Sequence, residues 1–117
     1  MHPKVRYAEL YIDNQRVGQV EVRRWEHSWG FGQFLPNDAF AAFAPLFGQW
    51  SLLMHADEDQ LSLSEAASQE LARVERAIDA LHVKLYFPAA GEWHQVGQVT
   101  IDGELIDWKE RWAQQPG

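Results

Sequence analysis

Residues 25–50 read WEHSWGFGQFLPNDAFAAFAPLFGQW and hold eight of the fifteen aromatic residues of the 117-residue chain. Large aromatic side chains bury more area than other side chains, so their concentration here predicts the centre of a hydrophobic core. In residues 28–34 aromatic residues alternate with Gly30 and Gly32, which predicts a short strand with a bulge or a close backbone contact. Pro36 ends this strand.

The second half of the stretch predicts helix. Asn37 is suited to an N-cap, and five apolar residues follow at spacings of three and four, which places them on one helical face: Phe40, Phe43, Phe47, Trp50 and Met54. Pro45 would remove a hydrogen bond inside a continuous helix, so we expect a kink or two shorter helical pieces. Residues 50–56 fit either helix or strand.

On either side of this stretch, the two ends of the chain predict hairpins. Residues 4–12 and 16–25 read as strands around the turn residues 13–15. Residues 82–87, 93–101 and 104–108 read as three more strands, the last two joined by Asp102-Gly103, a strong two-residue turn signal. Between the ends, Ser62-Leu63-Ser64-Glu65 matches a capping box before an apolar stripe of Ala67, Leu71, Val74, Ile78 and Leu81.

These elements predict one α+β domain over residues 1–117, with a frayed tail at 113–117. Its βββ-αα-βββ order would give an antiparallel sheet of five or six strands built from both chain ends, with the central helices packed on one face. The tetrapeptide VGQV occurs at residues 17–20 and again at 96–99. Both an internal duplication and a coincidence between short β segments are compatible with this repeat.

Composition excludes several classes of function. The chain has no cysteine, which removes disulfides, thiolate nucleophiles and cysteine-ligated metals, and its histidines lack metal-site spacing. The acidic net charge of −7 opposes nucleic-acid binding through Arg16, Arg23 and Arg24. We expect no cofactor and no metal. Neither a secretory signal nor an apolar run of about 20 residues is present, so a soluble cytoplasmic protein is expected, without membrane contact.

No catalytic motif is present, so the sequence favours a non-enzymatic interaction or scaffold domain that binds a protein partner or a second copy of itself. Tryptophan is enriched at interfaces, and an exposed aromatic sheet face would supply the contact surface, with the predicted interface at Trp93, Trp108 and Trp112. The alternative is a small-ligand-binding protein or small enzyme. Its pocket would be walled by Trp25, Trp29, Phe31 and Phe34, with Glu26 and His27 as the polar groups beside Trp25 and Trp29.

Overall fold

The computed structural model describes residues 6–59 and 65–110. In this part of the chain the elements follow in the order β1 (Arg6–Ile12), β2 (Gln15–Glu26), β3 (Trp29–Pro36), a 3-10 helix η1 (Asp38–Ala42), α1 (Ala44–Asp59), α2 (Glu65–Asp79), β4 (Val83–Phe87), β5 (Glu92–Asp102) and β6 (Leu105–Glu110). The prediction of a single α+β domain with two central helices and five or six antiparallel strands is confirmed, and the number of strands is six. The tail at 113–117 lies outside the described residues.

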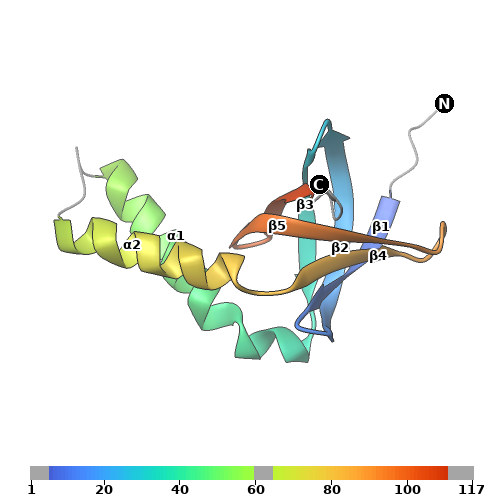
Figure 1. Cartoon of the computed structure of the whole chain (residues 1–117), viewed down its shortest axis with the longest axis horizontal. Coiled ribbons are helices and arrows are strands. Elements are labelled where there is room, and N and C mark those ends of the chain that lie inside the picture. The colour runs from blue at the N-terminus through green and yellow to red at the C-terminus, as the bar shows by residue number, and fades with distance from the viewer. Residues whose placement is uncertain (1–5, 60–64, 111–117) are drawn as a thin grey trace, which may run out of the picture.

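The six strands close into a barrel in the order β1-β2-β3-β6-β5-β4, with β4 pairing back to β1 (Figure 1). The two ends of the chain meet twice, since β1 pairs with β4 and β3 pairs with β6, always antiparallel. The predicted open sheet with helices on one face is therefore wrong. Alternation along a strand identifies its buried side, but it does not reveal whether the two edge strands of a sheet pair with each other and close a barrel.

The barrel interior is filled by side chains from alternate positions of all six strands. Trp108 of β6 is 0% exposed and meets Trp25 edge-to-face, with ring centroids 5.4 Å apart. Its ring lies over Gly30 of β3, which is its directly paired residue. A Cβ atom at Gly30 would come within 2.5 Å of the Trp108 ring, so this glycine makes room for the indole.

Gly32 lies where the backbones of β2 and β3 approach each other closely, as predicted for the glycines of residues 28–34. The register between β2 and β3 shifts between Val22 and Arg24, which forms a bulge opposite Gly32 and Phe31. A Cβ atom on Gly32 would lie 2.1 Å from the carbonyl oxygen of Glu21, so the two backbones approach more closely than a side chain allows. The predicted close contact is confirmed, whereas the bulge lies in the partner strand β2, with Arg23 as its extra residue. As a result Arg23 and Arg24 are both exposed.

The stretch from residue 37 onward closes one end of the barrel. Asn37 caps η1 by accepting a hydrogen bond from the Ala39 N–H at 2.9 Å, as predicted. Phe40 packs edge-to-face on Phe34 at 4.9 Å, which joins η1 to the barrel core. Because η1 and α1 are separate pieces and Pro45 is the second residue of α1, the two-piece alternative is correct and Pro45 interrupts no helix.

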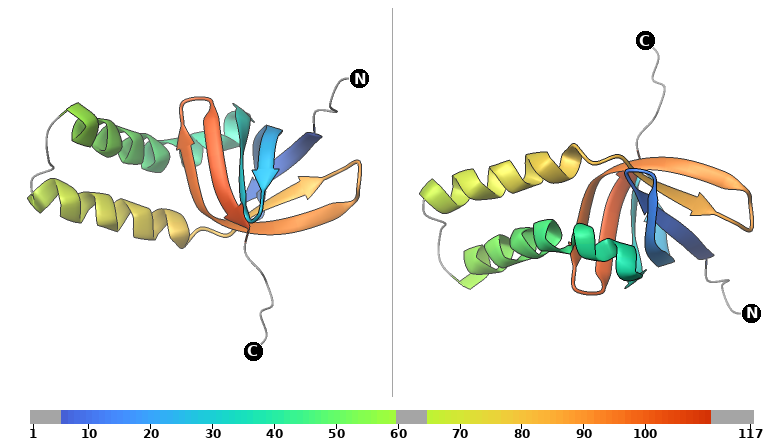
Figure 2. Two further views of the ribbon diagram at one scale, coloured as in Figure 1. Left: turned by 90° about the horizontal axis from the view of Figure 1, so that it is seen from above. Right: turned by 90° about the horizontal axis from the view of Figure 1, so that it is seen from below.

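The two α-helices form a hairpin that projects away from the barrel (Figure 2). Residues 50–56 belong to α1, which settles their assignment as helix. The hairpin is anchored by Phe47, Val74 and Ile78, which are buried in the barrel core, and by the Ser51 hydroxyl, which donates to the Ile101 carbonyl at 3.3 Å. Ser62, Leu63 and Ser64 of the predicted capping box lie outside the described residues. In the described helices, none is long and apolar enough to cross a membrane.

The two VGQV segments lie in β2 and β5, the strands at the middle of each three-stranded half. Leu10 of β1 pairs directly with Leu85 of β4 at the junction of the halves. The backbones of the two VGQV segments differ. In the second segment Gln98 has a φ of 48°, and the register between β5 and β6 shifts between Gly97 and Thr100. An origin by duplication stays a prediction.

Candidate functional site

The four residues predicted to bind a ligand are divided between the two sides of the barrel wall. Glu26, His27 and Trp29 line one hollow on the outside, of about 420 Å³, together with Arg24, Gly30, Phe31 and Asp107. Trp25 instead packs inward, against Phe87, His94 and Trp108. Alternation along β2 causes this division, because the neighbours Trp25 and Glu26 point to opposite sides of the strand, and Trp29 shares the outer side with its paired residue Glu26.

The four rings proposed as the walls of the alternative pocket do not meet in one cavity. Phe34 is buried in the barrel core, whereas Trp29 and Phe31 face outward. Odd-numbered residues of β3 point away from the barrel and even-numbered ones point into it, since side chains alternate along a strand. Trp29 and Phe31 thus share a surface with each other but not with Phe34.

The predicted interface of Trp93, Trp108 and Trp112 is not formed as a group. Trp108 is completely buried, so its assignment to a surface is wrong. Closure of the barrel turns this residue of β6 inward. Trp93 is 51% exposed and lies against Tyr86 and Tyr11, at centroid distances of 4.6 and 5.1 Å. Trp112 lies outside the described residues.

Four exposed large apolar side chains lie on β3 and β6 of the outer barrel wall. We call this group the β3 stripe, and it consists of Trp29, Phe31, Leu35 and Leu105. The exposed fractions of Trp29, Phe31 and Leu105 are 49%, 43% and 64%. Large apolar side chains gathered on a surface are typical of sites that bind another molecule.

Charged residues flank the two rings of the stripe with alternating sign. Trp29 has Glu26 of β2 on one side and Lys109 of β6 on the other, with the Lys109 ammonium 5.7 Å from the ring centroid. In the next outward row, the neighbours of Phe31 are Arg24 of β2 and Asp107 of β6. Along β2, Arg24 and Glu26 form an ion pair at 3.3 Å. The signs therefore alternate both across the rings and along the strands.

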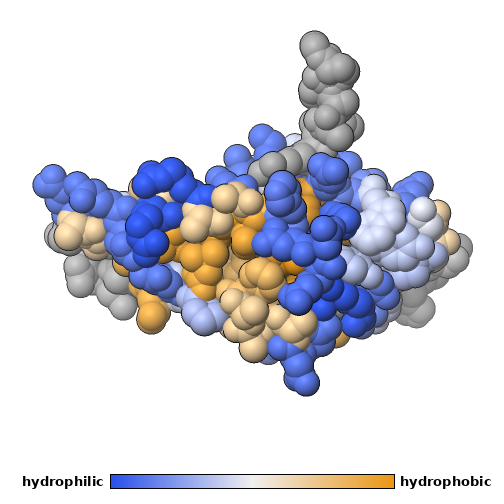
Figure 3. Space-filling view, turned by 60° about the horizontal axis from the view of Figure 1, so that its bottom comes forward, coloured by the Kyte–Doolittle hydropathy of each residue, from blue (hydrophilic) through white to orange (hydrophobic). Residues whose placement is uncertain are grey.

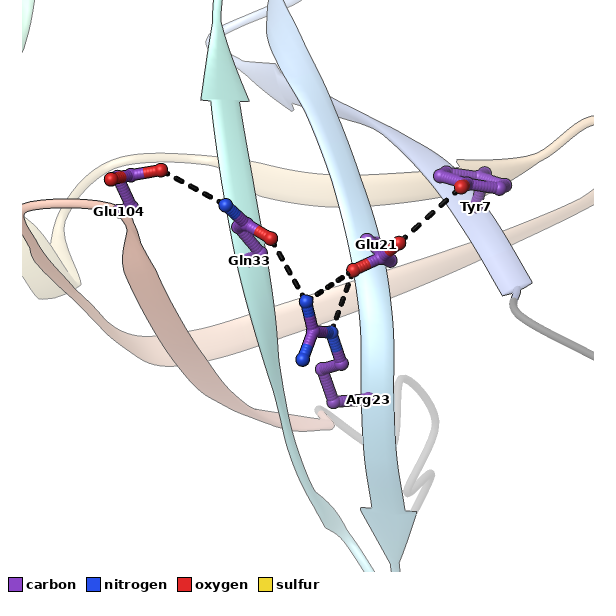
Figure 4. Close-up of polar contacts among 5 residues, drawn as sticks. All are labelled: Tyr7, Glu21, Arg23, Gln33 and Glu104. Atoms are coloured by element: carbon purple, nitrogen blue, oxygen red, sulfur yellow. Dashed lines mark hydrogen bonds and ion pairs between the residues drawn. The ribbon is translucent and has the colours of Figure 1, made fainter. Parts of the chain in front are cut away.

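A chain of polar contacts runs from strand to strand over β1, β2 and β3 (Figure 4). Arg23 donates to Glu21 at 2.6 Å and to the Gln33 side-chain oxygen at 2.9 Å, and Gln33 donates to Glu104 at 2.9 Å. The Tyr7 hydroxyl extends the chain to β1 by donating to Glu21 at 3.3 Å. These contacts separate Leu35 from the two rings, so the strongest apolar contact site is the pair Trp29 and Phe31, with Leu105 nearby.

A second hollow opens where the helix hairpin meets the barrel. This cleft has a volume of about 420 Å³ and is lined by Trp29, Trp50, Glu75, Ile78, Asp79, Gln98, Val99, Thr100 and Asp107. Ile78 and Val99 are buried and form an apolar floor. The Trp50 indole N–H donates to the Glu75 carboxylate at 3.4 Å, and the Thr100 hydroxyl donates to Asp107. Trp29 and Asp107 belong to this cleft and to the outer hollow alike.

Sequence reasoning missed this cleft because its lining comes from five separate elements: β3, α1, α2, β5 and β6. Trp50 appeared as one more ring of a helical stripe, although it is only partly buried and its edge reaches Glu75.

Figure 3 shows a further apolar area over η1 and the start of α1. The rings of Phe40 and Phe43 there are half-buried against the core, so this area mainly completes the packing of the barrel end.

Among residues 6–59 and 65–110, no group of three or more potential metal ligands comes together. Comparison of the chain with protein-family models, with curated proteins and with solved structures finds no match. The β3 stripe and the cleft beside it are therefore the two candidate functional sites.

Proposed function

We propose that this protein is an interaction domain that associates with a second copy of itself through the β3 stripe. The observation that carries the proposal is a pair of half-exposed rings whose flanking charges alternate in sign. An apolar centre with a charged rim is the ordinary composition of a protein interface. Here the rim is also complementary to itself.

This self-complementarity follows from the positions of the charges. When two copies face each other about a twofold axis parallel to β3, the β2 side of one copy lies against the β6 side of the other. Glu26 then faces Lys109 of the second copy, and Arg24 faces Asp107. An axis across the strands, centred between the two rows, brings Glu26 against Arg24 and Lys109 against Asp107. Either arrangement pairs opposite charges, and most homodimers have such a twofold axis.

The free energy available from the rings is sufficient for measurable association. An aromatic side chain buries about 150–250 Å², so half-exposed Trp29 and Phe31 each retain roughly 100 Å² for contact. At about 25 cal/mol per Å², covering one ring contributes at most about 2.5 kcal/mol. In a twofold dimer each copy contributes its own Trp29 and Phe31, so the contribution of each ring counts twice. Because a stable interface removes about 800 Å² from each partner, the charged rows must also take part.

Sedimentation equilibrium of the Trp29→Ala and Phe31→Ala variants tests the proposal. We expect a concentration-dependent dimer for the unchanged protein and about 100-fold weaker association for each variant, allowing for incomplete burial of the rings. Trp93→Ala is the matched control, because Trp93 is equally exposed but lies on a different part of the wall, and it should change the dissociation constant less than threefold. A protein that stays monomeric at millimolar concentration, or weaker association in Trp93→Ala alone, would contradict the proposal.

A further inference from the structure

We infer that the cleft between the helix hairpin and the barrel binds a small organic ammonium ion that carries an apolar body. The cleft combines an apolar floor, two tryptophan walls and a carboxylate rim in about 420 Å³. This volume lies within the range of roughly 300–1,000 Å³ found for small-molecule sites. The inference does not depend on self-association.

The floor and the walls select the apolar part of the ligand. Ile78 of α2 and Val99 of β5 are almost inaccessible and offer only hydrocarbon to an occupant. Trp29 and Trp50 come from β3 and α1 and line the same hollow. Indole rings attract cations through their π faces, and the Lys109 ammonium over the Trp29 ring is an internal example of this contact.

The rim selects a positive charge. Glu75 and Asp79 of α2 and Asp107 of β6 line the cleft, whereas no arginine or lysine of the described residues does. Two basic groups lie in adjoining hollows, Lys109 beside Asp79 and Arg24 beside Asp107. The three carboxylates of the cleft outnumber them, so the local balance is negative. An anionic ligand would meet like charge. A neutral ligand would gain no charge–charge attraction from the carboxylates of the rim.

The hydrogen-bonding groups favour an ammonium that carries N–H donors. Glu75 and Asp107 each accept one hydrogen bond from the protein, from Trp50 and from Thr100. A carboxylate has acceptor positions for about four hydrogen bonds, so both retain capacity for a ligand donor. A primary ammonium brings three donors and thus fits this rim better than an alcohol.

Three compounds with a similar apolar body and different charge test the inference: 2-phenylethylammonium, 2-phenylethanol and 3-phenylpropionate. Each is titrated into ¹⁵N-labelled protein while the indole N–H signals of Trp29 and Trp50 are followed by NMR. We expect the ammonium compound to bind at least tenfold more tightly than the alcohol, with an affinity that falls as salt is added, and the carboxylate to show no binding. Equal binding of the ammonium and the alcohol, or no shift of either indole signal, would overturn the inference.

Matched variants separate the rim from the overall charge. Glu75→Gln with Asp107→Asn keeps an oxygen acceptor for Trp50 and for Thr100 but removes two charges from the rim. Asp38→Asn with Glu65→Gln removes two charges from outside the cleft. Only the first pair should reduce ammonium binding, by roughly tenfold, and it should leave binding of the alcohol unchanged. Equal losses in both pairs would refute a specific site.

Ligand binding and self-association can be tested separately, because Phe31 lines the outer hollow but not the cleft. The cleft and the β3 surface share Trp29 and Asp107, so the comparison is made at a concentration at which both proteins are monomeric. There a Phe31→Ala variant should bind 2-phenylethylammonium with unchanged affinity, although its association at higher concentration is weakened. If this variant loses ligand binding while it remains folded, the cleft is not the independent site that we infer.

Discussion

Replacing Gly30 with alanine would place a methyl group against the indole of Trp108. The added Cβ would lie 2.5 Å from two ring carbons of Trp108 and 2.7 Å from its Nε1, whereas carbon atoms in contact are about 3.5–4.0 Å apart. Trp108 is completely buried and packed against Trp25, so the ring has little room to withdraw. Gly30 does not have a positive φ, so the effect measures packing and not backbone strain.

Overpacking of a rigid core costs about 1–3 kcal/mol, and the two contacts at 2.5 Å place Gly30→Ala near the upper end, at about 3 kcal/mol. Trp108→Phe removes the ring edge that meets Gly30, together with a buried Nε1 that has no hydrogen-bond partner among the described residues. We expect this change alone to cost about 2 kcal/mol, because the lost volume outweighs removal of the unpaired donor. The double variant should be more stable than the sum of the two changes predicts, by at least about 1 kcal/mol.

Urea denaturation followed by far-ultraviolet circular dichroism measures all four proteins. With a slope of about 1.5–2 kcal/mol per molar urea, Gly30→Ala should lower the midpoint by about 1.5–2 M. A change below about 0.5 kcal/mol, the usual limit for a neutral surface substitution, would refute the proposed contact. Strict additivity in the double variant would do the same.

Two further substitutions test other parts of the fold. Gly48 is exposed within α1, and a Cβ built there meets no described atom within 4 Å apart from its chain neighbours and the helix's own backbone. Gly48→Ala should therefore stabilise the protein by about 0.5–1 kcal/mol, seen as a midpoint raised by a few degrees in thermal denaturation. The hydrogen bond from Arg73, partly opposed by desolvation, lowers the pKa of Glu70, and the Arg73 charge and Gln49 also lower it. Because this pKa is lower in the folded state, the contribution of Glu70 to stability is present above the unfolded value of about 4.3 and is lost as the pH falls through the folded value. Thermal denaturation should thus show that Glu70→Gln is less stable than the unchanged protein at pH 6 and that the difference shrinks towards pH 2.5, whereas a constant difference would contradict the ionic role.

Strand and helix positions could be predicted from the sequence because they depend on local patterns. The alternation around Gly30 and Gly32 identified β3, and the paired spacing of Val74 and Ile78 identified the buried side of α2. Barrel closure could not be predicted in this way. It depends on β1 reaching β4 and on β3 reaching β6, and these contacts are distant in sequence.

The candidate sites were predictable only where a single strand carries them. Trp29 was predicted within the strand at residues 28–34 and as a wall of the alternative pocket, and it lies in both hollows. Trp108 was misassigned because a tryptophan near the chain end gives no sign of which way its strand faces. The pairing of β6 with β3 and β5 determines that the face of β6 carrying Trp108 lies inside the barrel.

The most direct test of the central claim uses the alternating charges around Trp29 and Phe31. Arg24→Glu, Glu26→Arg, Asp107→Lys and Lys109→Asp together reverse the sign at every position of the pattern. The reversed pattern is again complementary to itself, so this variant should form its own dimer. It should not pair with the unchanged protein, because like charges would then face each other about either twofold axis.

Native mass spectrometry of an equimolar mixture measures this pairing after the subunits have had time to exchange. We expect both homodimers and a heterodimer far below its statistical share. A heterodimer at the full statistical proportion, or no dimer of either chain, would contradict the claim that this face joins two copies of the protein.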